Sequence, residues 1–356
     1  MKTTRFAATL LAVLAAGSAT AALAGTPAGL DVLREWNLVV LGDLQSSSEV
    51  EGRTFVGGNL SGNSSNYNIK ASTPSTNGQP GLTVVGNVIG GTKNLNNGSG
   101  AIIGGNVDSG FNLNGAAQTV KVGGTIKNTN VNQNTVQSGL GGSNPAFVQN
   151  LQQDRSLLTT SMTGLSHDLG QLTQNSSFTI AGNRGTFNAV PGADGVAVFN
   201  LTAADLNKIG EIRFNLNGAD TAIVNVSGAA INLNDNFLGG TNNLGQNVIW
   251  NFPDATTMNV STAWGGSVLA PKAAATTGNY IQGSAVFGSL VQNGEMHVGT
   301  YAGTYTPPSG GSTSSSGGSS TSSGGTQVPE PGMLAMMLLG LLGLGFIVRR
   351  KRSRAA

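Results

Sequence analysis

The segment Ile102-Ile103-Gly104-Gly105-Asn106-Val107 defines the repeating unit of this chain. It consists of two β-branched residues, a glycine pair, a polar residue and a further apolar residue. Related units lie at residues 55–60, 84–88 and 120–126, and the unit at 84–88 has a single glycine. Aligned on Val56, Val85, Ile103 and Val122, the units are 29, 18 and 19 residues apart. A strand that ends in a glycine corner and then restarts gives this pattern, because glycine admits the positive φ that we expect at such a corner.

A second repeat alternates asparagine with apolar residues. The sequence of residues 111–116, Phe-Asn-Leu-Asn-Gly-Ala, is repeated without change at residues 214–219, and looser versions lie at 94–98 and 231–234. Strict alternation with a period of two indicates strands with one buried face. Repeats of about 20 residues are typical of a solenoid, in which asparagines stacked coil over coil can bond along the column. We therefore expect a mainly β protein, a right-handed parallel β-helix. The alternative is a β-sandwich adhesin, whose strands also recur at short intervals.

One segment departs from the β pattern. Asn144 followed by Pro145 indicates the start of a helix, and the helical pattern ends near Gly170. The apolar residues at helical spacing are Phe147, Leu151, Leu158, Met162, Leu165 and Leu169. This spacing predicts one long amphipathic α-helix that packs alongside the solenoid and is weakened at Gly164.

The composition excludes several classes of protein. The chain has 54 glycines, 10% charged residues and 5% aromatic residues, too few Leu, Glu and Lys for a helical enzyme or coiled coil. It has no cysteine, which excludes disulfides and thiolate metal sites. Seven of the 18 basic residues lie in the two terminal segments, so 11 remain between residues 25 and 328, against 15 acidic residues. We expect no binding to nucleic acid, because a weakly acidic body does not attract a phosphate backbone.

Residues 1–24 have the order of a secretory signal peptide. Lys2 and Arg5 form the charged region, residues 6–14 the apolar region, and Ala22 and Ala24 the small-x-small cleavage site. We expect the chain to be exported across the inner membrane by the secretion machinery and to start near Gly25 once mature.

The other end has three parts after the domain that we expect at residues 25–306. Residues 307–327 are a linker rich in Gly, Ser and Thr, which cannot bury a core. A sorting segment at 328–354 follows, with an apolar run at 332–348 that only just spans a bilayer at about 1.5 Å per residue. Before this run stand Val328, Pro329, Glu330 and Pro331, and after it stand Arg349, Arg350, Lys351 and Arg352. The basic residues are expected to stop transfer and stay cytoplasmic.

This order, in which a Val-Pro-Glu-Pro motif is followed by an apolar run and a basic end, resembles the PEP-CTERM sorting signal. The resemblance implies an exosortase, a membrane enzyme that processes the tail, as a partner. The protein would be held in the membrane by its C-terminal helix until processing. The alternative is a plain C-terminal anchor without processing.

No catalytic constellation is recognisable. His167, at the end of the predicted helix, is expected to interact favourably with the dipole of the helix C-terminus. His297, near Glu295, is expected to be a surface strand residue. Glu49 and Glu51 could share one face of a strand, but glycosidic chemistry needs a carboxylate pair in a cleft rich in aromatic residues. A calcium loop is conceivable at 232–236, but it lacks the Gly and the acidic residue that an EF-hand loop needs. We therefore predict no catalytic residue, no metal site, no cofactor and no enzymatic activity.

Three motifs together carry a second resemblance. The opening residues 36–43 (Trp-Asn-Leu-Val-Val-Leu-Gly-Asp), the Val-Gly-Gly-Asn units and the closing residues 266–271 (Gly-Ser-Val-Leu-Ala-Pro) resemble the choice-of-anchor A domain over most of residues 30–305. The resemblance implies an extracellular, adhesin-like module. The closing stretch is also similar to bacterial ice-binding β-solenoids, which pair a β-helix with one long helix.

We therefore expect an exosortase-sorted protein of the cell surface or extracellular matrix. Its role would be that of a non-enzymatic adhesin or exopolysaccharide-associated module, in which many weak hydrogen bonds to a matrix polymer add by multivalency. One alternative is an ice-binding solenoid, which needs a flat face with a regular column of Thr or Asn. The other is a polysaccharide-processing β-helix enzyme, which needs acidic residues clustered on one face. In the sequence the acidic residues look dispersed, and no Thr-x-Thr column recurs at the repeat spacing.

Overall fold

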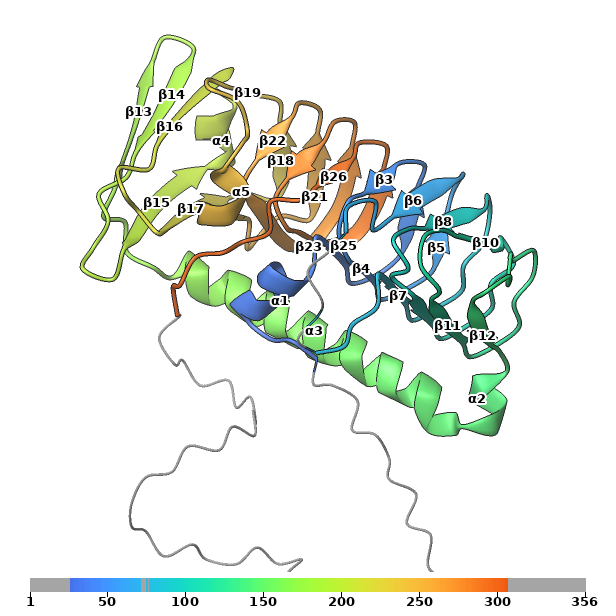
Figure 1. Ribbon diagram of the computed structural model, residues 1–356. Helices are drawn as coiled ribbons and strands as arrows, with labels where there is room; N and C mark the ends of the chain where they lie inside the picture. Colours follow the sequence, from blue (N-terminus) through green and yellow to red (C-terminus); the bar gives the residue numbers. More distant parts are fainter. Residues whose placement is uncertain (1–25, 72–74, 76, 307–356) are drawn as a thin grey trace, which may run out of the picture. The chain divides into compact units, whose positions relative to one another are not determined.

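The computed structural model describes residues 26–71, 75 and 77–306 (Figure 1). They belong to one compact unit, Met1–Ser312, whereas a second unit, Thr313–Ala356, lies outside the described residues. The predicted signal peptide with Ala22 and Ala24, the linker at 307–327 and the sorting segment at 328–354 also lie outside them. No helix in the described part of the chain is long and apolar enough to cross a membrane.

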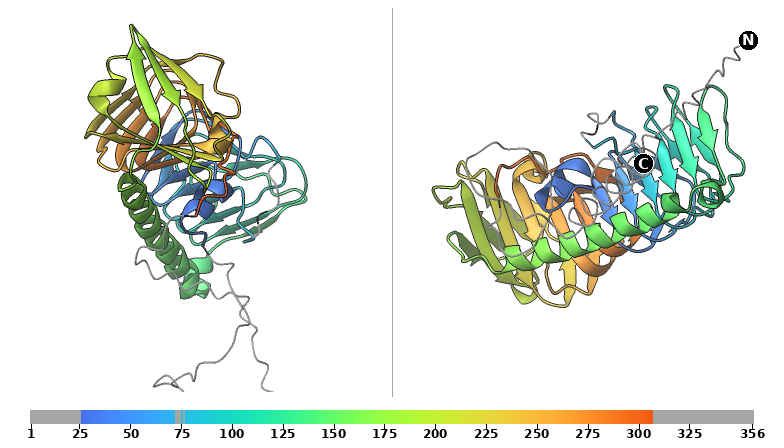
Figure 2. Two further views of the ribbon diagram at one scale, coloured as in Figure 1. Left: turned by 90° about the vertical axis from the view of Figure 1, so that its left-hand side faces the viewer. Right: turned by 90° about the horizontal axis from the view of Figure 1, so that it is seen from below.

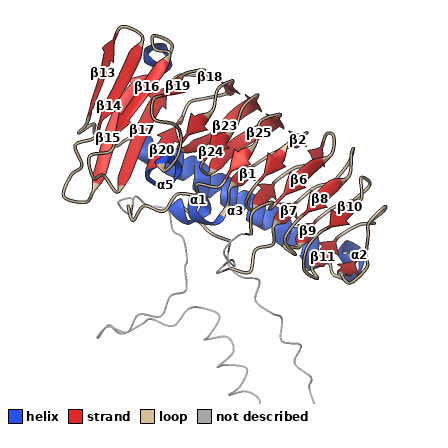
Figure 3. Ribbon diagram, turned by 45° about the horizontal axis from the view of Figure 1, so that its top comes forward, coloured by secondary structure: helices blue, strands red, loops and turns tan. Residues whose placement is uncertain are grey.

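The described chain is mainly β and winds into coils whose strands stack in three ladders (Figures 1 and 3). The helix-covered ladder runs in the order β12 (Thr135–Gln137), β11 (Thr119–Val122), β9 (Ala101–Ile103), β7 (Leu82–Val84), β4 (Thr54–Val56), β1 (Leu38–Val40), β25 (Ala285–Gln292), β23 (Ser267–Thr277), β20 (Val248–Asn251), β17 (Thr221–Ser227) and β15 (Val196–Thr202). A second ladder contains β18 (Ala230–Leu233), β21 (Thr257–Val260), the later parts of β23 and β25, β2 (Leu44–Ser46) and β5 (Leu60–Ser61).

The third ladder consists of β10 (Phe111–Leu113), β8 (Lys93–Leu95), β6 (Ser65–Tyr67), β3 (Glu49–Val50), β26 (Met296–His297), β24 (Ile281–Gln282) and β22 (Trp264–Gly265). A separate sheet has the order β13 (Ser177–Ala181), β14 (Arg184–Asn188), β16 (Glu211–Asn215) and β19 (Asn236–Phe237). The helices are α1 (Leu30–Glu35), α2 (Leu140–Ser143), α3 (Pro145–Gly170), α4 (Ala203–Leu206) and α5 (Leu244–Asn247).

The pairing of these strands rules out the β-sandwich alternative. Among the described residues every strand pair is parallel except β13 with β14. A sandwich is built from antiparallel strands, whereas coils that wind in one direction place successive strands in parallel. The expected solenoid architecture is consistent with these large parallel sheets.

The order of the coils in space differs from their order in the sequence. From β1 the coils build outward to β12, and after α3 the chain restarts at β15 and builds back to β25. The two halves meet where Val39 of β1 pairs with Val286 of β25. We call this contact between β1 and β25 the seam; on the third ladder it continues as the pairing of Met296 with Val50.

Alternating side chains fill the interior of the coils. In β10 and β18 the larger apolar residues Phe111, Leu113, Ile231 and Leu233 point inward and are buried, while Asn112 and Asn232 are exposed, as their period of two predicts. In the half built from β15 to β25 the interior contains a stack of aromatic rings. Both apolar clusters consist entirely of residues between 30 and 305, so this part of the chain has its own core.

The glycine corners do not have the backbone conformation that the sequence suggested. Gly57, Gly104 and Gly123 lack a positive φ. Instead, a Cβ at Gly104 would lie 2.2 Å from the carbonyl oxygen of Val85, and one at Gly123 would lie 2.0 Å from that of Gly104. Glycine is required here because each corner packs directly on the backbone of the preceding coil.

The predicted helix is present as α3, which is 26 residues long and runs along the stack (Figure 2). Its apolar stripe, which includes Leu158, Met162 and Leu165, packs against the outward side chains of the helix-covered ladder, such as Ile223 and Leu269. Polar contacts add to this packing. The side-chain amide of Asn225 donates to the carbonyl of Leu169 at 2.8 Å, and the guanidinium of Arg155 donates to the carbonyl of Leu41 at 3.1 Å.

Residues 298–305 form a C-terminal strap that crosses several coils. The Ala302 N–H donates to the carbonyl of Gln246 just before β20, and the Thr304 N–H donates to Asp220 just before β17. The ring of Tyr301 is almost completely buried, and its hydroxyl is 2.6 Å from that of Thr221. The guanidinium of Arg34 in α1 lies over the same ring. The strap therefore ties the coils of β20 and β17 to the N-terminal helix.

Candidate binding surface

The second ladder presents two columns of short side chains to solvent. Because the strands are in register, Ala230 stands beside Thr257, which stands beside Ala274, and Asn232 stands beside Asn259, which stands beside Thr276. The columns continue through Ser289, Val291 and Gln45. We call this surface the open face; its residues are Ala230, Asn232, Thr257, Asn259, Ala274, Thr276, Ser289, Val291 and Gln45.

The open face follows from the local sequence. Its strands alternate these short outward residues with buried inward ones, for example Ile231, Met258 and Ala275. Parallel strands about 4.8 Å apart then repeat the outward groups at that interval. None of the nine residues is charged. Charged side chains stand at its border, where the exposed Asp43 and Lys272 each precede an open-face residue, Gln45 and Ala274, by two positions. The arrangement can offer hydroxyl, amide and methyl groups to an extended, uncharged partner.

A column of asparagines lies at the corners of the repeating units, on the coils that follow β2. The Oδ1 of Asn59 accepts the N–H of Asn87 at 2.9 Å, that of Asn87 accepts the N–H of Asn106 at 2.8 Å, and that of Asn106 accepts the N–H of Thr125 at 2.8 Å. Asp43 starts the column by accepting the N–H of Asn59 at 2.7 Å. This confirms that asparagines bond coil over coil. Because their oxygens are used within the stack, we assign the column to stability.

The third ladder has its own outward column, which we call the asparagine face; it consists of Asn112, Asn94, Asn66 and Glu49. The amide of Asn112 donates to Asn94 at 2.8 Å, and that of Asn66 donates to Glu49 at 3.0 Å. These side chains therefore bond to one another along the column, unlike those of the open face.

Several acidic residues that looked dispersed in the sequence come together at the seam. Since Met296 pairs with Val50, Glu295 stands beside Glu49. Each carboxylate already has a partner: Glu51 pairs with Lys70 at 2.9 Å, and Glu295 with His297 at 2.7 Å. In the described part of the chain no group of three or more His, Asp or Glu residues could hold a metal ion.

His297 and His167 lie where the sequence placed them. His297 is a partly exposed residue of β26 whose ring stacks on that of Tyr280 with centroids 4.4 Å apart. His167 is exposed in the last turn of α3. The two histidines lie on different elements, and neither contacts the open face.

The segment at 232–236 does not form a loop of converging oxygens. Asn232 is exposed on the open face, whereas Asp235 is completely buried. Neither carboxylate oxygen of Asp235 has a hydrogen-bond partner, and burial raises the pKa of this group to about 7. The sequence analysis missed this isolated carboxyl group, although the alternation that points Ile231 and Leu233 inward, continued by two residues, also points Asp235 inward.

The sequence analysis also missed the open face. The three positions Ala230, Thr257 and Ala274 are 27 and 17 residues apart, so no fixed period connects them. The signal that could have found them is the local alternation of Ala, Thr or Asn with apolar residues in each strand. Aligning those strands requires the lengths of the intervening loops, which the sequence pattern does not give.

The fold and this surface define a class: parallel coils with one long helix alongside and an uncharged, exposed ladder. Residues 29–298 match the family described as "Putative Ice-binding-like adhesive domain", which covers most of the chain. The chain belongs to this ice-binding-like adhesive family. The description differs from the choice-of-anchor A domain, so that resemblance remains an expectation.

A second match lies at the C-terminal end. Residues 327–352 match the PEP-CTERM protein-sorting motif, which contains the predicted Val328, Pro329, Glu330 and Pro331. The motif implies exosortase processing and export to the cell surface. No curated protein and no solved structure matches the chain.

Proposed function

We propose that this protein is a non-enzymatic adhesin whose open face binds a matrix polysaccharide at the cell surface. The observation that carries the proposal is the uncharged double column from Ala230 to Gln45. A neutral polymer with a regular repeat can make the same weak contact with coil after coil, and such contacts add by multivalency. The expected right-handed winding of the coils agrees with the strong preference of parallel crossovers for that hand.

A matched pair of variants tests the role of the open face. Asn259→Tyr places a bulky ring in the middle of the open face, and Asn112→Tyr places the same ring on the asparagine face. Both positions are exposed on strands whose neighbouring coil also carries an asparagine. We expect Asn259→Tyr to lower binding to exopolysaccharide isolated from the displaying cells about tenfold, and Asn112→Tyr to leave it unchanged. Equal binding by both variants would refute the assignment of the open face.

Ice binding is a second candidate, favoured by the Thr, Asn and Ala columns at coil spacing. The same two variants separate it from adhesion when ice recrystallisation is measured beside polysaccharide binding. Loss of ice activity with Asn259→Tyr, together with unchanged polysaccharide binding, would favour ice as the partner. The polysaccharide-processing alternative finds less support, because the carboxylates at the seam are paired with Lys70, His297 and Asn66.

We further propose that the exosortase removes the tail and that the apolar run at 332–348 holds the protein in the membrane until then. Mass spectrometry of the surface protein, with and without exosortase, tests this step. We expect a chain that begins near Gly25 and ends near Val328 only when the enzyme is present. An intact tail in both strains would leave a simple membrane-anchored protein.

A further inference from the structure

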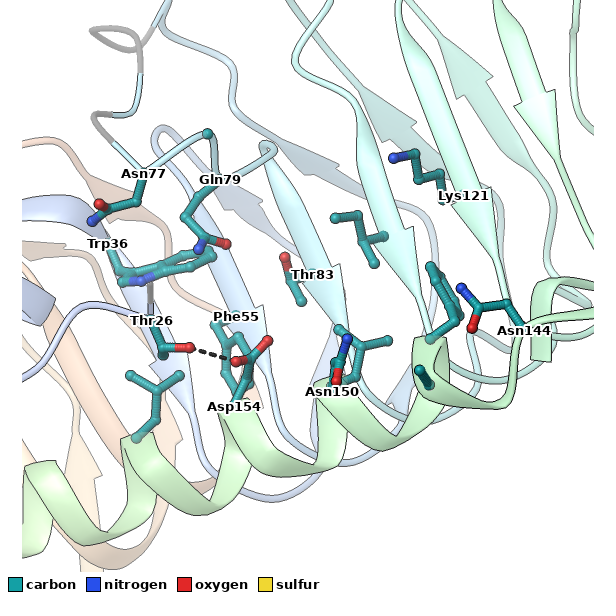
Figure 4. A pocket seen from close by; sticks show the side chains of 16 residues that line it. Thr26, Trp36, Phe55, Asn77, Gln79, Thr83, Lys121, Asn144, Asn150 and Asp154 are labelled. Carbon is teal, nitrogen blue, oxygen red and sulfur yellow. Dashed lines mark hydrogen bonds between the residues drawn. The ribbon is translucent and has the colours of Figure 1, made fainter. Parts of the chain in front are cut away.

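A groove separates the N-terminal half of α3 from the helix-covered ladder (Figure 4). Its volume is about 610 Å³, within the range of roughly 300–1,000 Å³ that is usual for ligand pockets. The groove lies on a different side of the coils from the open face, because it is lined by the ladder that α3 covers. The proposed adhesive function does not use it.

The floor of the groove is a single column of outward side chains. Phe55, Thr83, Ile102 and Lys121 come from four consecutive coils and stand beside one another in register. Three strand spacings of about 4.8 Å give a floor about 14 Å long. The groove is therefore elongated along the axis of the stack.

The wall is a stripe of α3 with the helical steps of four, three and four residues. It presents Phe147, Leu151, Asp154 and Leu158 to the groove. Asp154 bonds to the hydroxyl of Thr26, and burial raises the pKa of Asp154, which favours its neutral form. Asn150 of α3 also lines the groove, whereas Phe147, Leu151 and Leu158 are apolar, so a hydrocarbon chain in the groove would lie against these three side chains.

The two ends of the groove differ in charge. At the end beside β4, the buried rings of Trp36 and Phe55 pack edge-to-face with centroids 5.7 Å apart and close the groove, and the uncharged Asn77 and Gln79 lie beside them (Figure 4). At the other end lie Lys121 and Asn144 (Figure 4). Lys121 is exposed and forms no ion pair with any residue that the structure describes. An anion at this end would meet an unpaired positive charge and a side-chain amide.

We propose that the groove binds a free fatty acid, with its carboxylate beside Lys121 and its acyl chain along Ile102 and Phe147 toward the end that Phe55 and Trp36 close. The length of the floor suits a single chain of medium length, the apolar floor and wall replace water around it, and the charge at one end fixes its direction. Two-chain membrane lipids do not fit a floor that is one column wide.

The test uses residues 26–306, which have their own core, and titrates dodecanoic acid and 1-dodecanol by calorimetry. We expect one acid bound per chain. Lys121→Glu should weaken binding of the acid at least about tenfold and leave binding of the alcohol unchanged. Ile102→Trp, which fills the floor with a side chain that points outward, should weaken both. If Ile102→Trp fails to fold, Ala146→Phe at the exposed border of the groove replaces it.

Lys272→Glu is the control, since Lys272 is also an exposed lysine of β23 that forms no ion pair with a described residue, and it does not line the groove. We expect it to bind the acid like the unchanged protein. The proposal fails if the folded protein does not bind the acid, or if Lys121→Glu and Ile102→Trp bind it as well as Lys272→Glu does. Lys121-dependent binding to phosphatidylglycerol vesicles in place of the free acid would also overturn it.

Discussion

Asn251 of β20 and Ser166 of α3 exchange two hydrogen bonds. The Ser166 hydroxyl donates to Oδ1 of Asn251 at 2.6 Å, and Nδ2 of Asn251 donates to the Ser166 carbonyl at 2.8 Å. Both side chains are buried, and Nδ2 of Asn251 also donates to Asn225 on the next coil at 2.8 Å. This pair fixes the position of the helix along the stack, because apolar packing alone does not specify register.

We predict that Asn251→Leu lowers the free energy of unfolding by about 2–3 kcal/mol. The change keeps the approximate volume but leaves the buried Ser166 hydroxyl and the Asn225 oxygen without a partner. Urea unfolding followed by circular dichroism measures the loss. Asn259→Leu is the control, because this side chain is exposed on β21 and a surface change of this kind shifts stability by less than about 0.5 kcal/mol. Equal losses in the two variants would contradict the role of the pair.

The glycine corners give a second prediction, built on two alanine substitutions. Gly123→Ala should destabilise the protein by more than about 2 kcal/mol, because the new Cβ would overlap the backbone of the preceding coil. Gly164→Ala should stabilise it by about 1 kcal/mol, since Gly164 lies inside α3 with open space around it. Thermal unfolding of both variants is the measurement. Similar effects of the two changes would show that the corner glycines are not required by packing.

Asp235 predicts how stability depends on pH. Its pKa is raised in the folded protein, so the folded state keeps the proton that the unfolded state loses between about pH 4 and pH 7. The contribution of Asp235 to the free energy of unfolding should therefore be complete below pH 4 and fall as the pH rises to 7, by up to roughly 4 kcal/mol. Asp235→Asn should remove most of this slope in urea titrations from pH 4 to pH 8, and an unchanged slope would exclude Asp235 as its cause.

The pH scan ends at 8 because a second buried group titrates above that value. Lys93 is completely buried, and its amine donates to the carbonyls of Gly62 and Asn63. Burial lowers the pKa of Lys93 to about 8. Here the unfolded state binds more protons between pH 8 and the usual lysine pKa, so Lys93 makes stability rise with pH in that range.

Tyr301 allows a test of the C-terminal strap. Tyr301→Phe keeps the buried ring over which Arg34 lies but removes the hydroxyl that contacts Thr221. We predict a loss of about 1 kcal/mol, the usual net contribution of one hydrogen bond. Hydrogen exchange should show the loss as faster exchange of the Ala302 and Thr304 amides. If exchange of these amides is unchanged, the hydroxyl does not hold the strap.

The sequence predicted those parts of the fold that depend on local pattern. The alternating segments 111–116 and 231–234 contain most of β10 and β18, and the helical spacing after Asn144 corresponds to α3, because one buried face leaves a period in the sequence. The clustering of Glu49 with Glu295 and the open face depend on which coils are neighbours, and a repeat does not specify that order. The positive φ that we expected at the corner glycines was wrong. Glycine is required there because a Cβ would overlap the backbone of a neighbouring coil, and the repeat does not show which coil is the neighbour.

The seam has a consequence for how the chain folds. The first strand, β1, has β4 on one side, but its other side stays unpaired until β25, the last strand of that ladder, has been made. Loop closure between such distant segments is slow. Until the seam closes, the unpaired edge of β1 can form hydrogen bonds with a strand of another chain. A circular permutant that starts after α3, joins residue 306 to residue 26 and ends with α3 would have all its coils in sequence order. Closing the seam would then be a local step, and such a chain should fold faster and aggregate less while it does so.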